Sequence, residues 1–452
     1  MNDRSRGHPS STEPAGGQIS NAGRTGGVRS NTIVASASSL LNGLVNAGML
    51  AYAARQGQTG EIAAYSVMTA ALTWVAILVM GGSSLLYVSG HEHERQAVRS
   101  QRVLIALPIM IVATAVLAAL YGGRGYAGVA LVAAGGVLML NSLAELRYSD
   151  LIRQMRFVAA SAALTSTRLL ALALLIGGVP LTVALAAGAA VYLLVMEVLA
   201  CRPKTGIRPM WSGLSMRAAG GAFRLNRRLF GYSIADAFSA RAGTIALSLV
   251  ASPHVVGCYG ALVSIYQALV AVVFSGLRVP MAIRTRRRHR IGPPGAVGRE
   301  AEIISVTAST LIAAGIIGFA PWLTMTVLNL GLPESALWLQ LLALALPFAT
   351  VNRAFALNRI GDGDYRAATR TALSIATLVA GGLLVQAAIL GPAGTATAAG
   401  IAEVVVAVAL LAAAARRRRA SRTTPPSSPD RLRPARTGTV RRDSVASAGR
   451  GD

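Results

Sequence analysis

Long apolar stretches alternate with short polar segments along almost the whole chain. A bilayer core about 30 Å thick requires about 20 apolar residues in a helix that crosses it. Twelve stretches of about that length carry few charges: 32–52, 62–88, 103–120, 126–146, 157–176, 180–200, 229–250, 255–280, 303–320, 335–351, 367–390 and 392–415. The pattern predicts an all-α polytopic membrane protein with about twelve transmembrane helices.

A thirteenth apolar stretch, 321–332, lies between Pro321 and Pro333. It is too short to span a bilayer, so we expect an interfacial segment on the outer side.

The basic residues give this segmentation an orientation. All but four of the 43, namely Arg55, Arg124, Arg168 and Arg241, lie in the two tails, in alternate loops or at the span ends next to those loops. Cytoplasmic loops of membrane proteins carry an excess of Arg and Lys. The distribution therefore predicts an even number of spans, with both termini in the cytoplasm.

Composition agrees with a membrane protein and changes how the charge is interpreted. The 452 residues are 53% apolar and 13% charged, whereas soluble domains are about 25% charged. The net charge of +25 would suggest a nucleic-acid partner only if it lay on a soluble domain, so we expect no nucleic acid. Lys204 is the only lysine, which is typical of a high-GC bacterial genome and favours a bacterial plasma (inner) membrane.

Five segments follow from these patterns. We expect a disordered cytoplasmic tail (1–30), an N-lobe of six spans (31–200), a basic cytoplasmic linker (201–228), a C-lobe of six spans (229–415) and a basic disordered tail (416–452). The last tail and the basic loops would contact anionic lipid headgroups, and partner or RNA binding is the alternative for the tail. Cys201 and Cys258 would lie near opposite faces, which excludes a disulfide framework.

An internal repeat relates the two sets of six spans. The sequence EIAAYSVMTAALTWVAILVMGG, from Glu61, matches VVGCYGALVSIYQALVAVVFSG, from Val255, at an offset of 194 residues. The same offset pairs Asn42 with Asp236, and a weaker match at offset 211 pairs Asn141 with Asn352. The halves run in the same in/out sense, so we expect two pseudo-symmetric lobes about an axis along the membrane normal. Coincidence between two Ala-, Val- and Leu-rich sequences is the alternative.

These repeated segments resemble a known family. The sequence NGLVNAGMLAYAARQGQTGEIAAYSVMTAALTWVAILVMGGSSLLYVSG, from Asn42, resembles the opening of the polysaccharide-transporter (Wzx-like) flippases of the MOP superfamily. The sequence ADAFSARAGTIALSLVASPHVVGCYGALVSIYQALVAVVFSGLRVPM, from Ala235, is similar to the start of that family's second lobe. The resemblance implies a two-lobed, MATE-like bundle that moves a lipid-linked oligosaccharide to the outer leaflet. Drug and cation antiporters of this superfamily usually carry an acid in helix one or seven, and Asn42 takes the helix-one position here.

Four ionisable residues stand out deep inside predicted spans. Each costs at least about 2.5 kcal/mol at a helix centre, so those that are present generally face a partner or a water-filled cavity. Arg168, Arg241 and Glu403 lie about 16–18 Å from their entry points, and Asp236 about 10 Å. Asp236 and Arg241 are turned about 140° from each other on an ideal helix and are poor mutual partners.

These positions yield the candidate site. A guanidinium is a donor fork suited to phosphate oxygens, so Arg241 is the candidate diphosphate anchor, with an ion pair to Glu403 or another acid as the alternative. Asp236, Asn42, Asn46 and Gln267 are expected to line the same central cavity, between spans one, two, seven and eight. Glu403 and Arg168 are candidates for a coupling-ion site or a structural ion pair.

Other motifs suggest little chemistry. The sequence HEHER at His91 offers two imidazoles and two carboxylates, but its short cytoplasmic loop and i, i+2 spacing disfavour a metal site. GDGD at Gly361 lacks the rest of a calcium loop and is typical of a turn. Topology explains RTRRRHR at Arg284, with a patch that attracts anionic lipid or a diphosphate headgroup as the alternative. No nucleophile elbow, phosphate loop or paired-carboxylate site is present. We therefore expect no catalytic residue, no metal and no cofactor.

Three classes of function remain. The first is a flippase for a polyprenyl diphosphate oligosaccharide in cell-surface or exopolysaccharide biosynthesis, with polysaccharide-assembly proteins as candidate partners. The second is a cation-coupled multidrug or small-molecule exporter of the same superfamily. The third is a polytopic polysaccharide polymerase, which the short outer loops disfavour.

Overall fold

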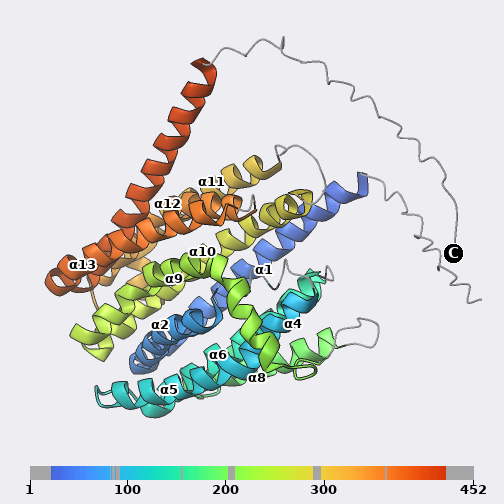
Figure 1. Ribbon diagram of the computed structural model, residues 1–452. Helices are drawn as coiled ribbons and strands as arrows, with labels where there is room; N and C mark the ends of the chain where they lie inside the picture. The colour runs from blue at the N-terminus through green and yellow to red at the C-terminus, as the bar shows by residue number, and fades with distance from the viewer. Residues whose placement is uncertain are drawn as a thin grey trace, which may run out of the picture. The chain divides into compact units, whose positions relative to one another are not determined.

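The computed structural model describes residues 22–81, 83, 87, 92–153, 156–201, 209–288, 297–361 and 364–423. All regular structure in these ranges is helical (Figure 1). The elements are α1 (Ala22–Arg55), α2 (Thr59–Met80), α4 (Glu92–Gln101), the π-helix η1 (Arg102–Ala106), α5 (Leu107–Gly122), α6 (Gly128–Arg153), α7 (Phe157–Ile176), α8 (Leu181–Ala200), α9 (Met216–Val250), α10 (Pro253–Arg288), α11 (Val297–Trp322), the π-helix η3 (Leu323–Val327), α12 (Ser335–Gly361) and α13 (Tyr365–Thr423).

The expected multi-pass architecture is confirmed. Nine helices of the described residues are long and apolar enough to cross a membrane. The other three predicted stretches lie within α1, α9 and the first part of α13. Gly391, with a φ of +56°, interrupts α13 between the eleventh and twelfth predicted spans, and Pro392 follows it. Many large apolar side chains are exposed along these helices, as lipid-facing residues are.

Several predicted boundaries differ from the structure. The helix α1 begins at Ala22, inside the segment expected to be disordered, and α13 continues to Thr423 in the basic tail. The second half of the predicted linker is the start of α9. The stretch 321–332 is not a separate interfacial segment, because the helix continues through Pro321 and ends with η3 at Val327. Pro321 has no amide donor for the carbonyl of Ile317, which instead accepts from the Gln340 side chain of α12 at 3.1 Å.

Two compact units divide the described chain. One ends at Val408 and contains nearly all the helices, and the other begins at Ala409 with the last turns of α13. Within the first unit, α1 packs on α10 and α2 packs on α9. The repeat equates α1 with α9 and α2 with α10, so these two contacts are equivalent across the two halves.

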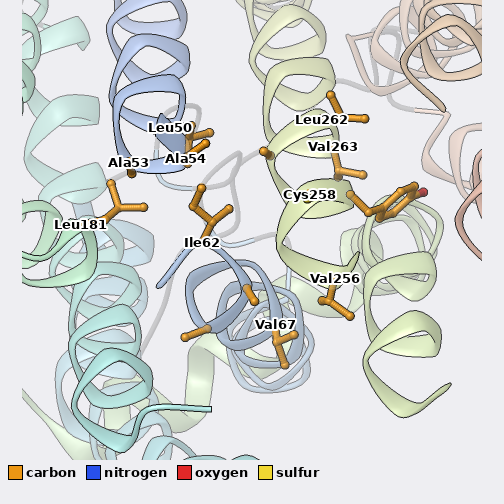
Figure 2. Packing of buried hydrophobic residues seen from close by; sticks show 14 of the residues in the cluster. Leu50, Ala53, Ala54, Ile62, Val67, Leu181, Val256, Cys258, Leu262 and Val263 are labelled. Atoms are coloured by element: carbon orange, nitrogen blue, oxygen red, sulfur yellow. The ribbon is translucent and has the colours of Figure 1, made fainter. Parts of the chain in front are cut away.

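The largest apolar cluster joins both halves at the predicted outer ends of their helices. Leu50 and Ala54 of α1 lie beside Ile62 of α2, and Leu262 of α10 belongs to the same cluster (Figure 2). Leu50, Ile62 and Leu262 are at most 1% exposed. Inside a bilayer such packing, and not the exclusion of water, holds helices together, so small residues that allow close approach are favoured.

Candidate functional site

A buried ion cluster connects three helices of the C-terminal half. Arg353 on α12 lies 3.2 Å from the carboxylate of Glu403 on α13 and 3.6 Å from that of Asp236 on α9. Asn352 donates from Nδ2 to the Glu403 carboxylate (2.6 Å) and to its backbone carbonyl (2.9 Å). One guanidinium thus faces two carboxylates, which leaves the cluster with a formal charge of −1.

A small polar cavity lies beside this cluster. Its volume is about 40 Å³, and a water molecule needs about 10–15 Å³ by this measure. Its polar lining comes from Ser239, Thr244, Gln267, Arg353, Thr395 and Glu403. The side chain of Asp236 is 44% exposed, whereas that of Glu403 is 9% exposed. The cavity is large enough for a few waters or a small cation next to the Glu403 carboxylate, but not for an oligosaccharide.

Arg241 lies on a different face of α9. Phe238, one turn before it, stacks at 5.0 Å on Trp74 of α2, and Tyr65 of α2 is close enough to interact electrostatically with Arg241. Arg241 is partly exposed, and no carboxylate among the described residues lies within 4.0 Å of it. Glu403, its expected alternative partner, pairs with Arg353 instead. Arg241 therefore offers an uncompensated positive charge where α9 faces the first half.

The other expected site residues are divided between different surroundings. Gln267 lines the C-terminal cavity. Asn42 donates to the carbonyl of Ser38 in its own helix (2.7 Å), and its Oδ1 is buried with no hydrogen-bond partner in the structure. Asn46 is half-buried. Arg168 of α7 has Tyr192 of α8 as a neighbour and pairs with no carboxylate of the described residues. The five polar residues expected around one central cavity thus do not form a single cluster here.

Sequence analysis missed a second buried ion cluster, in the N-terminal half. Arg147 of α6 donates from Nε (2.6 Å) and Nη2 (2.9 Å) to both oxygens of Glu197 on α8. It also donates to Asp150 (3.1 Å), which accepts from the Tyr87 hydroxyl at 3.0 Å. Arg147, Asp150 and Tyr87 are at most 3% exposed. The i, i+3 spacing of Arg147 and Asp150 at the end of a predicted span is the signal that could have indicated it.

The Cys201 thiol borders this N-terminal cluster. It donates to Glu197 at 3.4 Å, next to the helix end. Burial raises the pKa of Cys201, so the thiol stays protonated and keeps its donor proton.

A seam of small residues runs between α2 and α10. A Cβ placed on Gly257 would collide with the carbonyl of Thr59 and touch Ala63, and one on Gly260 would collide with the Ser66 side chain. Ala63 and Gly257, like Ser66 and Gly260, are 194 residues apart. Residues equivalent in the repeat therefore meet each other, as they must next to a two-fold axis.

Polar contacts close the same end of the helices. Arg55, at the end of α1, donates to the carbonyls of Thr326 and Val327 (3.1 Å for Val327). The hydroxyl of Tyr121 is 3.2 Å from that of Ser248. Both contacts connect the first half to the second, so the predicted outer ends of the two halves are held together.

No three His, Cys, Asp or Glu side chains gather into a metal-binding group in the described ranges. Of HEHER, the residues from Glu92 onwards belong to α4, and Glu92 pairs with Arg95. Asp364 of GDGD instead accepts a hydrogen bond from the Ala367 amide (3.1 Å) at the start of α13. The side chains of RTRRRHR and residue His91 lie outside the described residues.

Comparison with solved structures identifies relatives of this architecture. The lipid II flippase MurJ, in an inward closed conformation, aligns with a TM-score of 0.64 at 13% identity over 85% of this chain and 87% of that one. The MATE multidrug transporter DinF-BH in complex with R6G aligns with a TM-score of 0.56 at 14% identity over 87% and 96%. An inward-facing multidrug resistance MATE family transporter of the MOP superfamily gives 0.54 at 13% over 88% and 96%.

The amino-acid sequence does not assign the chain to a family. No protein-family model and no curated protein matches the chain. The twelve predicted spans, the repeat contacts and these alignments give the chain the two-lobed, MOP/MATE-like membrane fold that these transporters share.

Proposed function

We propose that this chain is a bacterial plasma-membrane transporter that flips a lipid-linked oligosaccharide, carried on a polyprenyl diphosphate, by alternating access. The fold supports a transporter, and one of its structural neighbours is a lipid II flippase. The observation that carries the choice of an anionic substrate is Arg241, an intramembrane arginine with no acid near it among the described residues.

The argument from Arg241 is electrostatic. An uncompensated charge near the bilayer midplane is costly, so it is kept where a ligand or water can solvate it. A diphosphate presents oxygens that a guanidinium binds with two parallel hydrogen bonds. Arg241 faces α2 of the other half, and a headgroup held there would pass between the lobes while its lipid tail stays in the bilayer.

The second candidate function is a cation-coupled exporter, which the C-terminal cluster favours. Its net charge of −1 and the cavity beside Glu403 suit a small cation, and MATE exporters share the fold. The same cluster would serve a flippase as the coupling site, with Asp236 and Glu403 as the cation-binding groups. The substrate, and not the cluster, distinguishes the two functions.

Replacing Arg241 tests the proposal. In proteoliposomes that contain a fluorescent polyprenyl diphosphate oligosaccharide, Arg241→Ala should lose nearly all flipping and Arg241→Lys should retain part of it, because charge and fork geometry both matter. Arg168→Ala, the other intramembrane arginine without an acid, is the matched control and should keep most activity. Complementation of a strain whose surface polysaccharide depends on this protein should rank the variants in the same order.

The outcomes separate the alternatives. Full flipping by Arg241→Ala, at equal protein abundance in membrane immunoblots, would reject the anchor. No flipping by the unmodified protein, together with efflux of a cationic dye, would favour the exporter.

A further inference from the structure

The linker that joins the two halves is bound to the first half along one side. The carbonyl of Gly213 accepts from Gln96 of α4 at 2.8 Å, and the backbone amide of Ser215 donates to the hydroxyl of Ser100 at 3.2 Å. Ser215 then begins α9, with its hydroxyl accepting from the amide of Ala218. The described part of the linker, from residue 209 onwards, is therefore bound to the first half.

The first turns of α9 continue this attachment. Ala219, Ala222 and Asn226, spaced i, i+3 and i+7, are buried, and α9 packs on α4 (Figure 1). Asn226 donates to the carbonyl of Met80 (2.8 Å) and to the side chain of Gln101 (2.9 Å). One face of this helical segment is thus buried against α2 and α4.

The exposed side of this segment carries both apolar and basic side chains. Trp211, Met216 and Phe223 are 57%, 65% and 42% exposed, and Arg217 and Arg224 are exposed beside them. Met216 and Phe223 are seven residues apart, as are Arg217 and Arg224, so each pair lies on one line along the helix. All five lie outside the twelve predicted spans.

An anionic lipid surface satisfies both properties of this face. Amphipathic helices with Trp, Phe or Leu on one side and arginines beside them lie in the headgroup region, with the apolar side chains about 5–10 Å into the bilayer. Tryptophan is enriched at that depth. The linker also lies on the side to which the basic loops assign the cytoplasm, where anionic lipids attract arginine. Phe223 precedes the seventh predicted span by six residues, about 9 Å of helix, so this face is next to the membrane.

We propose that Trp211, Met216, Arg217, Phe223 and Arg224 form an interfacial anchor that binds the anionic lipid surface of the predicted cytoplasmic leaflet. The apolar side chains enter the headgroup region and the two guanidinium groups pair with lipid phosphates. The buried side of the same segment contacts α2 and α4. The anchor therefore holds the start of α9, which joins the two halves, at a set depth in the membrane. This role does not depend on which substrate the protein moves.

A spin label at Gly220 measures the depth of the anchor. Gly220 is exposed, and a Cβ there has nothing within 4 Å, so Gly220→Cys is tolerated sterically. The full chain, with Cys201→Ser and Cys258→Ala, is reconstituted in phosphatidylcholine vesicles or in vesicles that also contain phosphatidylglycerol. With the anionic lipid, the label should become more accessible to oxygen and less accessible to nickel-EDDA. A label at Gly60→Cys, an exposed position on the predicted outer side, should not respond.

Removing the charges should reverse the response. Docking here means insertion of the anchor into the headgroup region, as read from the accessibility of the Gly220 label. Arg217→Gln with Arg224→Gln should lower the equilibrium constant for docking in anionic vesicles by about fivefold for each arginine. Arg366→Gln with Arg370→Gln is the matched control, because it removes two exposed arginines from the start of α13 and leaves the linker intact. Added salt should weaken docking in the unmodified protein, since ionic screening acts on exposed charges.

Three results would overturn the anchor. The first is equal nickel accessibility at Gly220 in the two kinds of vesicle. The second is an equal loss of docking in the linker pair and the α13 pair. The third is protection of the label in lipid-free detergent with a doubled particle mass, which would assign the face to a second copy of the chain. A melting temperature for each variant within the range of the Gly60 control keeps misfolding apart from these outcomes.

Discussion

The two halves each tie their fourth helix to their sixth with an arginine and a glutamate, but at different depths and to different effect. In the first half, Arg147 of α6 binds Glu197 of α8 near the helix ends. In the second half, Arg353 of α12 binds Glu403 of α13, and Glu403 lies about 16 Å into its predicted span. The same connection therefore appears once at the membrane edge and once in its interior.

The third partner explains what the difference means. Asp150, in the first half, is on the same helix as Arg147 and is 2% exposed, with Tyr87 closing it off. Asp236, in the second half, comes from the first helix of its lobe and remains 44% exposed, and its partner Arg353 lines a cavity. A closed, satisfied cluster stabilises one arrangement of helices. An open one leaves a carboxylate accessible and can change its partner, which is what a coupling site requires.

The largest expected effect is on the closed cluster. Arg147→Met should lower the free energy of unfolding by about 3–5 kcal/mol, because it leaves two carboxylates without their buried counter-ion. Denaturant titration in detergent micelles would measure it, and membrane abundance should fall in parallel. Arg359→Met is the control, since Arg359 pairs with Asp364 at a partly exposed position and should change stability by about 1 kcal/mol or less. Equal effects of the two changes would contradict a structural role for the first cluster.

A smaller loss of stability with a larger loss of transport is expected from the open cluster. Glu403→Gln keeps a side chain that can bond Asn352, and Arg353 retains Asp236, so unfolding should be easier by only about 2 kcal/mol. Transport in proteoliposomes should lose its dependence on the imposed ion or pH gradient. Glu197→Gln is the counterpart in the first half, and any residual transport in that variant should keep its gradient dependence. If the two glutamines behaved alike, the distinction between the clusters would fail.

These two clusters show what the sequence could and could not predict. Hydropathy and basic-residue alternation predicted twelve spans, nine of which coincide with helices of the described residues that are long and apolar enough to cross a membrane, because length and charge act locally along the chain. Intramembrane position identified Asp236, Arg241 and Glu403 as costly groups, and the 140° angle correctly kept Asp236 and Arg241 apart. The predicted tenth span ends at residue 351, which makes Arg353 a loop charge in the sequence. In the structure this helix continues to Ile360, so Arg353 lies within it. Pairing between distant helices depends on packing that periodicity does not encode.

The smallest expected effect tests the symmetry that makes the halves comparable. Gly260 faces Ser66, its equivalent 194 residues earlier, and a methyl group on Gly260 would collide with the Ser66 side chain. Gly260→Ala should overpack the seam by about 1–3 kcal/mol while gaining about 1 kcal/mol of helix propensity, for a net loss of about 1 kcal/mol. The measurement is again unfolding in detergent micelles. A Cβ added at Gly315 has nothing within 4 Å, so Gly315→Ala should only gain helix propensity and raise the free energy of unfolding.

A swap across the seam makes this prediction specific. The obstruction at Gly260 comes from the Ser66 side chain and not from nearby backbone, so Ser66→Gly combined with Gly260→Ala transfers bulk from α2 to α10 and removes the collision. The swapped protein should recover the stability that Gly260→Ala loses, because contacts near a two-fold axis depend on the combined size of the two equivalent residues. Gly257→Ala should resist rescue by Ala63→Gly, since its obstruction is the carbonyl of Thr59. This account of how the two halves meet would be refuted if stability were recovered in both swapped pairs, Ser66/Gly260 and Ala63/Gly257, or in neither of them.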